Sequence, residues 1–344
     1  MLVGIARLAA ESSVLESKAQ VEYFEIQARS ILNRTKPNMP FTWTINPYRG
    51  CEFGCKYCYA RYTHEYMELD ATEFEKRIYV KRGAQVYLPE EIARKYSYES
   101  AASGRLAPEH IAIGTATDPY QPAEREYGVT RACLEELAKR EGLSISITTK
   151  SNQILRDLDL LRRIAEKSAL FVNMTVTTVR SRLARLLEPR APLPEARLAA
   201  VKQLREAGIS TGVFASPLLP GITDREGSLE AVAEAAHEAG AQWFVSGVLF
   251  LTPSSSKVFM PFLRERFPRL VERYQQWYMR NTYAPEEYRK RIAERVARLR
   301  QKYGFHVRPW DEMKRPVLPQ AQLRLDLDGT DCGSLEPGMP CAAR

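Results

Sequence analysis

Three cysteines lie close together in the sequence, at Cys51, Cys55 and Cys58. Thiolates are soft ligands that bind iron and zinc, and three thiols at this spacing cannot all pair with one another in disulfides. Gly50 and Gly54 give the backbone the freedom to wrap the three thiols around one centre. The pattern therefore indicates a metal centre.

The kind of metal centre follows from the number of ligands. Structural zinc usually takes four ligands in two paired halves, and no second Cys-x2-Cys or His-x3-His pair occurs in the sequence. Three ligands without a fourth fit an iron–sulfur cluster in which one iron stays open to a substrate or cofactor. A zinc site and three unligated, buried cysteines remain as alternatives.

The elements that must position these cysteines alternate between strands and helices. Short apolar runs predict strands over residues 41–46, 110–117, 144–149, 170–177, 209–219 and 242–250. Apolar residues at helical spacing predict helices over residues 130–141, 153–168, 195–207 and 228–239. This alternation predicts an α/β fold with a parallel sheet, and the cysteines follow its first strand. Six strands fit either a partial β/α barrel or an open doubly wound sheet.

The whole chain has the composition of an ordinary globular protein. Its 344 residues are 44% apolar and 27% charged, which excludes a disordered chain, a collagen and a coiled coil. No signal-peptide pattern and no apolar run of membrane-spanning length occurs, so we predict a cytoplasmic protein with no membrane segment. We predict four parts: an extension (1–40) with a helix and a Pro-bearing connection, a barrel (41–250), a basic aromatic helical segment (251–314) and a disordered tail (315–344).

The cysteine motif resembles the signature of a known family. Cys-x3-Cys-x2-Cys, with Tyr57 just before the last cysteine, is similar to the motif of the radical S-adenosylmethionine (SAM) superfamily. The resemblance implies that Cys51, Cys55 and Cys58 hold one [4Fe–4S] cluster and that SAM chelates its fourth iron. In that family, an electron from the cluster cleaves SAM to methionine and a 5′-deoxyadenosyl radical, which abstracts a substrate hydrogen. The implied fold is a partial (β/α)6 TIM-type barrel, here with an N-terminal extension and a C-terminal helical segment.

A narrower resemblance concerns one branch of that superfamily. Residues 46–59, 114–124, 147–151 and 188–192 are similar to the spore photoproduct lyase-like branch, and residues 59–64 resemble an uncharacterised subgroup of it. Many members of the branch are labelled DNA repair proteins. The resemblance implies a lyase-like radical SAM enzyme with nucleic acid as substrate, in DNA repair or modification.

One position departs from the lyase. The lyase returns a hydrogen atom to its product from a cysteine near the end of the second strand, where this chain has Thr115. A hydroxyl is a poor hydrogen-atom donor compared with a thiol, and Cys133 lies in a predicted helix. We therefore expect a reaction other than photoproduct cleavage by that mechanism.

Four residues at strand ends are candidates for SAM binding, because active sites of β/α barrels lie at the carboxyl ends of the strands. By resemblance to the lyase, Lys150 and Thr117 would hold the methionine carboxylate of SAM. Thr175 or Thr177 would contact other polar groups of SAM. Taken alone, Lys150 also fits a solvated loop lysine, and threonine is an ordinary strand residue.

Three further residues complete the candidate site. By the same resemblance, Tyr57 would contact the adenine of SAM, although it also fits plain packing beside the cysteine loop. Asp118 and Glu124 would bind the ribose or the amino group, but the Gly-Gly-Glu triplet of other family members is missing there. These assignments rest on the resemblance and not on the residue pattern.

Positive charge is concentrated near the C-terminus. Residues 264–302 hold 12 Lys and Arg and 5 Glu, an excess of +7 within a chain of net charge +8. Aromatic residues are interleaved with them at Phe267, Tyr274, Trp277, Tyr278, Tyr283 and Tyr288. Such a pattern suits phosphate contacts and base stacking, and it equally suits helices that cover the open barrel with their rings inward.

The tail holds one short motif. Residues 322–327, from Gln322 to Leu327, read QLRLDL and resemble the peptides with which bacterial repair proteins bind the sliding clamp. Cys332 and Cys341 lack the pattern of an auxiliary cluster, so we predict a single cluster. A flavodoxin or ferredoxin would supply the electron. Alternatives to a nucleic-acid substrate are a peptide or small metabolite with the same chemistry, and a metal-stabilised, non-catalytic nucleic-acid-binding protein.

Overall fold

The six predicted strands form the parallel part of one sheet. In the computed structural model, which describes residues 2–307 except 13, 19, 29, 37, 38 and 97–108, its strand order is β11-β10-β9-β8-β7-β4-β3. Neighbours from β4 to β11 are parallel, and β3 pairs antiparallel with β4. The strands are β3 (Leu32–Arg34), β4 (Trp43–Ile45), β7 (His110–Ile113), β8 (Ser144–Thr149), β9 (Ala169–Thr175), β10 (Ser210–Leu218) and β11 (Phe244–Val248).

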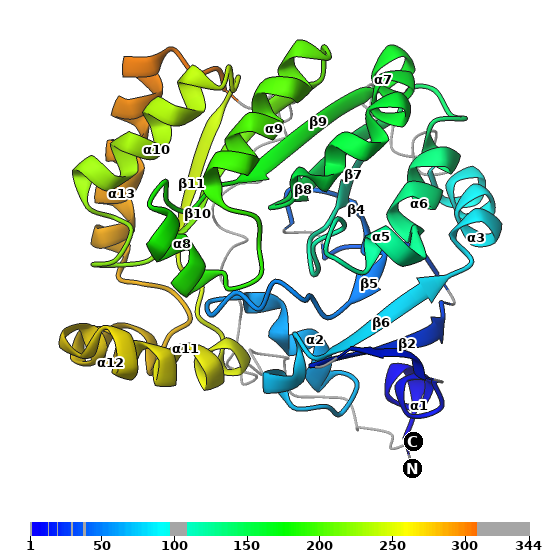
Figure 1. The fold of residues 1–344 in the computed structure, drawn as a ribbon, viewed down its shortest axis with the longest axis horizontal. Helices are drawn as coiled ribbons and strands as arrows, with labels where there is room; N and C mark the ends of the chain where they lie inside the picture. Colours follow the sequence, from blue (N-terminus) through cyan, green and yellow to red (C-terminus); the bar gives the residue numbers. More distant parts are fainter. Residues whose placement is uncertain are drawn as a thin grey trace, which may run out of the picture. The chain divides into compact units, whose positions relative to one another are not determined.

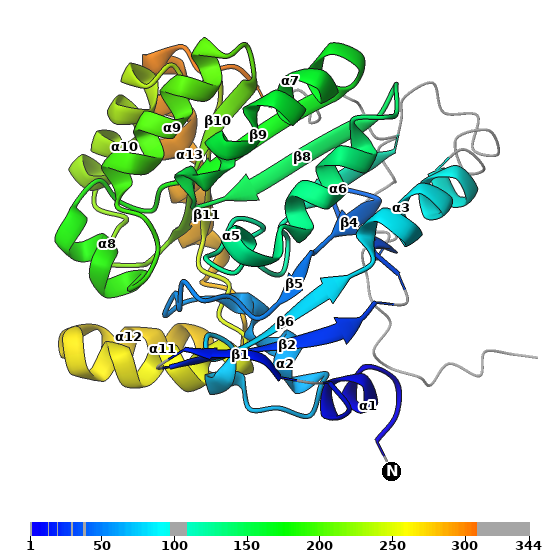
Figure 2. The same ribbon diagram turned by 45° about the vertical axis from the view of Figure 1, so that its right-hand side comes forward.

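The strand order decides between the two folds that the strand count allows. The parallel strands follow one another in sequence order, as in a β/α barrel, whereas a doubly wound sheet reverses its order at a switch point. Among the described residues, β11 and β3 have no strand on their outer sides, so the sheet is open (Figures 1 and 2). The prediction of a partial β/α barrel is confirmed.

The crossover helices cover the outer face of this sheet because each presents an apolar stripe to it. In α7, for example, Leu160, Leu161 and Ile164 are buried at helical spacing. The predicted helix over residues 153–168 begins as a 3-10 helix, whose N-cap is Ser151: its hydroxyl accepts a hydrogen bond from the backbone N–H of Gln153. The helices are α5 (Glu124–Tyr127), α6 (Val129–Leu137), η4 (Asn152–Asp157), α7 (Leu158–Lys167), α8 (Ser181–Leu187), α9 (Pro194–Glu206) and α10 (Glu226–Glu238).

A second sheet, with strand order β1-β2-β6-β5, was not predicted. The expected N-terminal helix corresponds to α1 (Gly4–Ala10), and the strands β1, β2 and β3 lie between it and Pro40. The parallel partner of β2 is β6, which lies about 55 residues further along the chain, so no local pattern reveals the pairing. The strands are β1 (Val14–Lys18), β2 (Val21–Gln27), β5 (Tyr48–Arg49) and β6 (Arg77–Arg82).

The second sheet carries the cysteine loop, since β5 leads directly into it and pairs with β6 behind it. The buried Arg61 braces the loop by donating to the backbone oxygens of Cys55, at 3.2 Å, and Ala71, at 3.0 Å. Short helices follow the loop and β6: η1 (Tyr59–Arg61), α2 (Tyr62–Glu65), η2 (Ala71–Glu73), α3 (Ala84–Glu91) and the π-helical turn η3 (Ile92–Tyr96).

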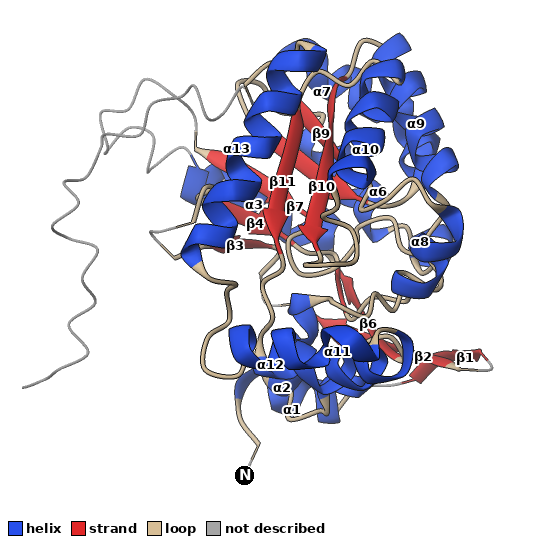
Figure 3. Ribbon diagram, turned by 90° about the vertical axis from the view of Figure 1, so that its left-hand side faces the viewer, coloured by secondary structure: helices blue, strands red, loops and turns tan. Residues whose placement is uncertain are grey.

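The C-terminal helices pack partly on the short helices that follow the cysteine loop and partly on the barrel (Figure 3). α11 lies against η1, η2 and α2, whereas α13 packs on β11 and α10. The rings of Tyr274 and Tyr278 are buried, and their hydroxyls donate to the backbone oxygens of Pro220 and Leu249. These rings therefore cover the barrel and are closed to a ligand. The elements are α11 (Pro253–Arg266), η5 (Pro268–Leu270), α12 (Val271–Tyr278) and α13 (Glu286–Tyr303).

Some predictions fall outside the described part of the chain. These are the disordered tail (315–344), the clamp-like segment 322–327 and the absence of a second cluster at Cys332 and Cys341. Of the helices that the structure describes, none is both long and apolar enough to cross a bilayer.

The barrel floor contains a histidine that should make stability depend on pH. Both ring nitrogens of His110 lie 2.8 Å from serine hydroxyls, of Ser144 and Ser146, and burial lowers its pKa from 6.5 to about 4. The unfolded chain then binds more protons between these two values, so stability is complete above pH 6.5 and falls as the pH approaches 4. This one group should remove about 2 kcal/mol of unfolding free energy between pH 7.5 and pH 5.

The measurement is urea unfolding at both pH values. His110→Gln should lose less stability on acidification than the wild type, by that same amount. His306→Gln, at an exposed position, is the matched control and should keep the wild-type difference. An unchanged pH dependence in His110→Gln would show that the buried imidazole carries no such linkage.

Candidate active site

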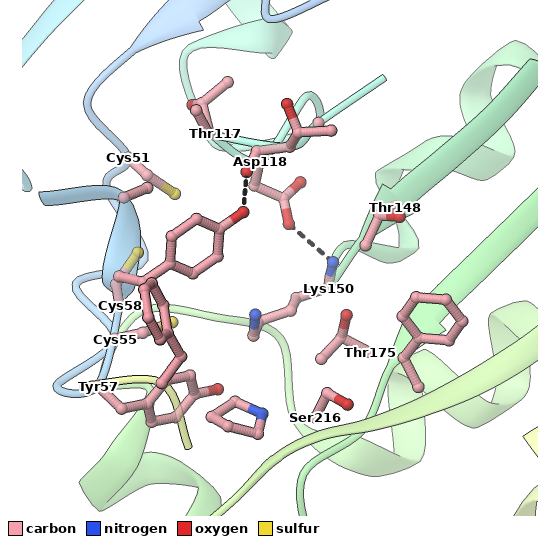
Figure 4. A pocket seen from close by; sticks show the side chains of 18 of the residues that line it. Cys51, Cys55, Tyr57, Cys58, Thr117, Asp118, Thr148, Lys150, Thr175 and Ser216 are labelled. Carbon is pink, nitrogen blue, oxygen red and sulfur yellow. Dashed lines mark hydrogen bonds between the residues drawn. The ribbon is translucent and has the colours of Figure 1, made fainter. Parts of the chain in front are cut away.

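A cavity of about 390 Å³ lies at the carboxyl ends of the barrel strands (Figure 4). Its size is that of a small-molecule pocket. One wall is the cysteine loop and the opposite wall is formed by the ends of β7, β8 and β9. The ends of β10 and β11 add an apolar side and a hydroxyl that the sequence analysis did not single out: Phe214, Ser216, Val248 and Leu249.

The loop that carries the cysteines is fixed by its first glycine. Gly50 has a φ of +81°, and a Cβ there would lie 2.5 Å from the backbone oxygen of Arg77. The Cys51 N–H donates to the backbone oxygen of Phe74 at 3.0 Å, and the Thr117 hydroxyl donates to that of Gly50 at 2.7 Å. The loop is thus seated between the two sheets.

Cys51, Cys55 and Cys58 all line the cavity, and none of them forms a disulfide. Burial is the main cause that raises the pKa of the Cys51 and Cys58 thiols, and it raises the pKa of Cys55 to about 12. Three soft thiols in such an environment need a cationic centre to be held as thiolates, so the donor set fits an iron–sulfur cluster. Among the described residues, no three His, Cys, Asp or Glu side chains are grouped closely enough to hold a single metal ion.

Lys150 reaches across the cavity toward the cysteines (Figure 4). Its ammonium lies 5.8 Å from the centre of the Tyr57 ring, and within the described residues it has no carboxylate at ion-pair distance. Burial alone would lower the pKa of Lys150, but Cys55, Glu188 and Asp118 raise it above the ordinary value. The cavity therefore contains a positive charge available to an anionic group.

Asp118 connects the ends of β7 and β8 by hydrogen bonds. Its carboxylate accepts hydrogen bonds from the Thr149 hydroxyl at 2.6 Å, the Lys150 N–H at 2.7 Å and the Tyr120 N–H at 3.0 Å. Burial is the largest influence and raises its pKa, although these bonds act in the opposite direction. Two carboxylate oxygens offer about four acceptor positions, so these three bonds leave one position unused.

The structure brings most, but not all, of the predicted SAM residues to the cavity. Tyr57, Thr117, Asp118, Lys150 and Thr175 line it together with the three cysteines. Thr177 does not line it, because its buried hydroxyl donates to Glu188 at 3.0 Å. Glu124 does not line it either: its buried carboxylate accepts from the Thr130 N–H at 2.7 Å and pairs with Arg156.

A buried ion pair beneath the cavity was missed. Glu188 pairs with Arg197, and both side chains are at most 1% exposed. The same carboxylate accepts hydrogen bonds from the Tyr57 hydroxyl and from Thr177. Burial would raise the pKa of Glu188, but Arg197 and Lys150 lower it overall, so it is a carboxylate. Glu188 lies in the segment 188–192, which resembles the spore photoproduct lyase-like branch, and this resemblance could have identified it from the sequence.

Comparison with known proteins places this geometry in a family. The sequence profile of the radical SAM superfamily matches residues 45–251, from β4 to just beyond β11. Uncharacterized proteins of Mycobacterium tuberculosis and Mycobacterium bovis are 35% identical over 332 residues, which cover 94% of this chain and 92% of theirs. An uncharacterized protein of Methanocaldococcus jannaschii is 30% identical over 74% of this chain and 87% of its own length.

Solved structures show the same fold. A spore photoproduct lyase mutant with bound AdoMet and dinucleoside spore photoproduct superposes with a TM-score of 0.61, over 82% of this chain and 79% of that one. At 16% identity, this similarity concerns the fold. Together with the profile match and the three cysteines at the cavity, it leads to one conclusion: the chain belongs to the radical SAM superfamily and is a radical SAM enzyme.

Proposed function

We propose that the enzyme holds one [4Fe–4S] cluster on Cys51, Cys55 and Cys58 and binds SAM beside it. The observation that carries this proposal is that the three thiols and the Lys150 ammonium face one cavity from opposite walls. A cluster bound there supplies the electron that cleaves SAM to methionine and a 5′-deoxyadenosyl radical. The electron would come from a flavodoxin or ferredoxin in the cytoplasm.

Different residues of the cavity bind different groups of SAM. Lys150 holds the methionine carboxylate, and the Thr175 hydroxyl contacts a polar group of SAM. Asp118 uses its open acceptor position for the ribose or the amino group. We assign Thr117 to the loop rather than to SAM, because its hydroxyl donates to the Gly50 backbone oxygen. The apolar side near Val248 suits the adenine ring.

The substrate we propose is a nucleic acid. Support comes from the excess of +7 charges in residues 264–302 and from the dinucleoside photoproduct held by the structurally similar lyase. The reaction we propose is not photoproduct cleavage by the lyase mechanism. Thr115 lines the cavity, with its hydroxyl 2.6 Å from that of Thr44, whereas Cys133 is buried in α6 and does not line it.

Anaerobic reconstitution of the full chain with iron and sulfide tests the chemistry. The protein should bind about four irons, show visible absorbance that dithionite bleaches, and form 5′-deoxyadenosine from SAM after reduction. Nucleic acid deuterated in its sugars and bases should then transfer deuterium into 5′-deoxyadenosine. Absence of 5′-deoxyadenosine would refute radical chemistry, whereas its formation without deuterium transfer would refute only the nucleic-acid substrate.

Lys150→Met should weaken SAM binding without loss of the cluster. A charge-assisted bond to a carboxylate contributes about 1.5–3 kcal/mol, so the Kd for SAM should rise by about 10- to 150-fold. Equilibrium dialysis of the iron-loaded variant against labelled SAM measures the change. Lys139→Met is the matched control, because Lys139 is exposed, pairs with Glu136 and does not line the cavity. Equal SAM affinity in the Lys150 and Lys139 variants would remove Lys150 from the site.

A further inference from the structure

A row of five aromatic rings passes beside the cavity. Two of its members, Tyr59 and Phe250, line the cavity itself, and the row continues outward on both sides of them. We call this row the aromatic strip. Its successive ring centres are separated by 5.3 Å (Tyr66–Tyr62), 6.4 Å (Tyr62–Tyr59), 6.3 Å (Tyr59–Phe250) and 4.7 Å (Phe250–Tyr283).

Three rings of the strip are exposed although they are large and partly apolar: Tyr59 is 42% exposed, Tyr66 64% and Tyr283 52%. The other two, Tyr62 and Phe250, are half-buried. Tyr274 and Tyr278, which precede Tyr283 in the same basic segment, are buried and bonded to backbone oxygens. A contiguous, partly exposed aromatic surface beside a cavity is typical of a ligand-binding site.

The rings are held in place at the middle of the strip and at its Tyr283 end. The Tyr59 hydroxyl donates to the backbone oxygen of Thr115, which also lines the cavity. Phe250 and Tyr283 face each other in an isolated β-bridge, and the Leu251 N–H donates to the Thr282 backbone oxygen at 2.9 Å. Since the rings are already ordered, a ligand that stacks on them loses little additional conformational entropy.

Positive charge accompanies the strip at both ends. The guanidinium of Arg289 lies 5.5 Å from the centre of the Tyr283 ring. Toward the other end, the half-buried Arg49 lies close enough to Tyr62, the second ring, to interact with it electrostatically, and its buried Nε has no hydrogen-bond partner among the described residues. The carboxylate of Glu65, which follows Tyr62 in α2, is already paired with Lys257. Charge at the strip therefore favours an anionic ligand.

We propose that the aromatic strip binds a single-stranded nucleic acid. Bases stack on the rings, while Arg49 and Arg289 contact phosphates. The base that stacks beside Tyr59 and Phe250, the two rings that line the cavity, is the one presented to it, as in enzymes that take their target base out of the stack. This inference rests on the proposed nucleic-acid substrate and names the surface that binds it.

Fluorescence anisotropy of labelled 12-nucleotide single strands with the iron-loaded full chain tests the strip. Tyr66→Ala and Tyr283→Ala should each weaken binding by about 5- to 150-fold, the range for loss of one stacked base. Tyr87→Ala, which removes a 37% exposed tyrosine in α3, is the matched control and should bind like the wild type. Arg289→Gln should lower the slope of log K against log salt by about 1.

The outcomes separate this inference from the function on which it rests. Weaker binding in both strip variants, together with weaker wild-type binding of a duplex or an abasic strand, supports the strip. Comparison of DNA with RNA strands then identifies the kind of strand. Wild-type binding that both strip variants retain would overturn the strip and leave a nucleic-acid substrate standing. No binding to any strand would overturn both the strip and the nucleic-acid substrate. Formation of 5′-deoxyadenosine in the same preparation tests the SAM chemistry independently.

Discussion

Each of the variants Cys51→Ala, Cys55→Ala and Cys58→Ala should lose its iron and form no 5′-deoxyadenosine from SAM. The three thiols are the soft ligands at the cavity wall, so removal of one leaves a four-iron centre with two protein ligands. We expect iron content to fall from about four per chain to near zero, and the dithionite-bleachable absorbance to disappear with it. Both are measured after anaerobic reconstitution.

Cys133→Ala is the control for this series. Cys133 is fully buried in α6 and does not line the cavity, so its replacement should leave iron content and SAM cleavage at the wild-type level. A variant of Cys51, Cys55 or Cys58 that keeps four irons would contradict the ligand assignment. Loss of iron in Cys133→Ala would point to a ligand outside the loop.

The barrel was predictable because each of its strands and helices can be recognised from its own short stretch of sequence. Central parallel strands such as β7 and β8 are buried on both faces and read as short apolar runs, and a crossover helix such as α7 carries its own apolar stripe. The second sheet lacks this property, since β5 is two residues long and β2 pairs with a strand from beyond the cysteine loop. Pairing over such a distance depends on the rest of the fold.

In the candidate site, too, some residues could be predicted from the sequence and others could not. The three cysteines share one short loop, and Lys150 follows a strand end, so spacing and topology were enough to bring them together. Thr177 lies only two residues beyond Thr175, yet the chain leaves the strand there and turns the hydroxyl toward Glu188. The partner of Glu188, Arg197, is on the next helix, and only the packed structure shows that both are buried together.

Glu188→Ala should destabilise the protein by about 3–5 kcal/mol, because it leaves the guanidinium of Arg197 buried without its counterion. The same change removes the acceptor of the Tyr57 hydroxyl, on whose ring the Lys150 ammonium lies. It also removes a negative charge that raises the pKa of Lys150. We therefore expect weaker SAM binding in addition to the loss of unfolding free energy, measured by isothermal titration and urea unfolding.

The double variant Glu188→Leu, Arg197→Met separates these two effects. It removes both buried charges, and a buried ion pair replaced by apolar side chains of similar size usually costs little stability. We expect it to regain most of the unfolding free energy that Glu188→Ala loses, but not the SAM affinity, since Tyr57 and Lys150 still lack the carboxylate. If Glu188→Ala lowers the free energy of unfolding by less than about 1 kcal/mol, the ion pair of Glu188 with Arg197 does not stabilise the site as its burial indicates. Recovery of SAM affinity in the double variant would show that Glu188 acts on the site only by pairing with Arg197.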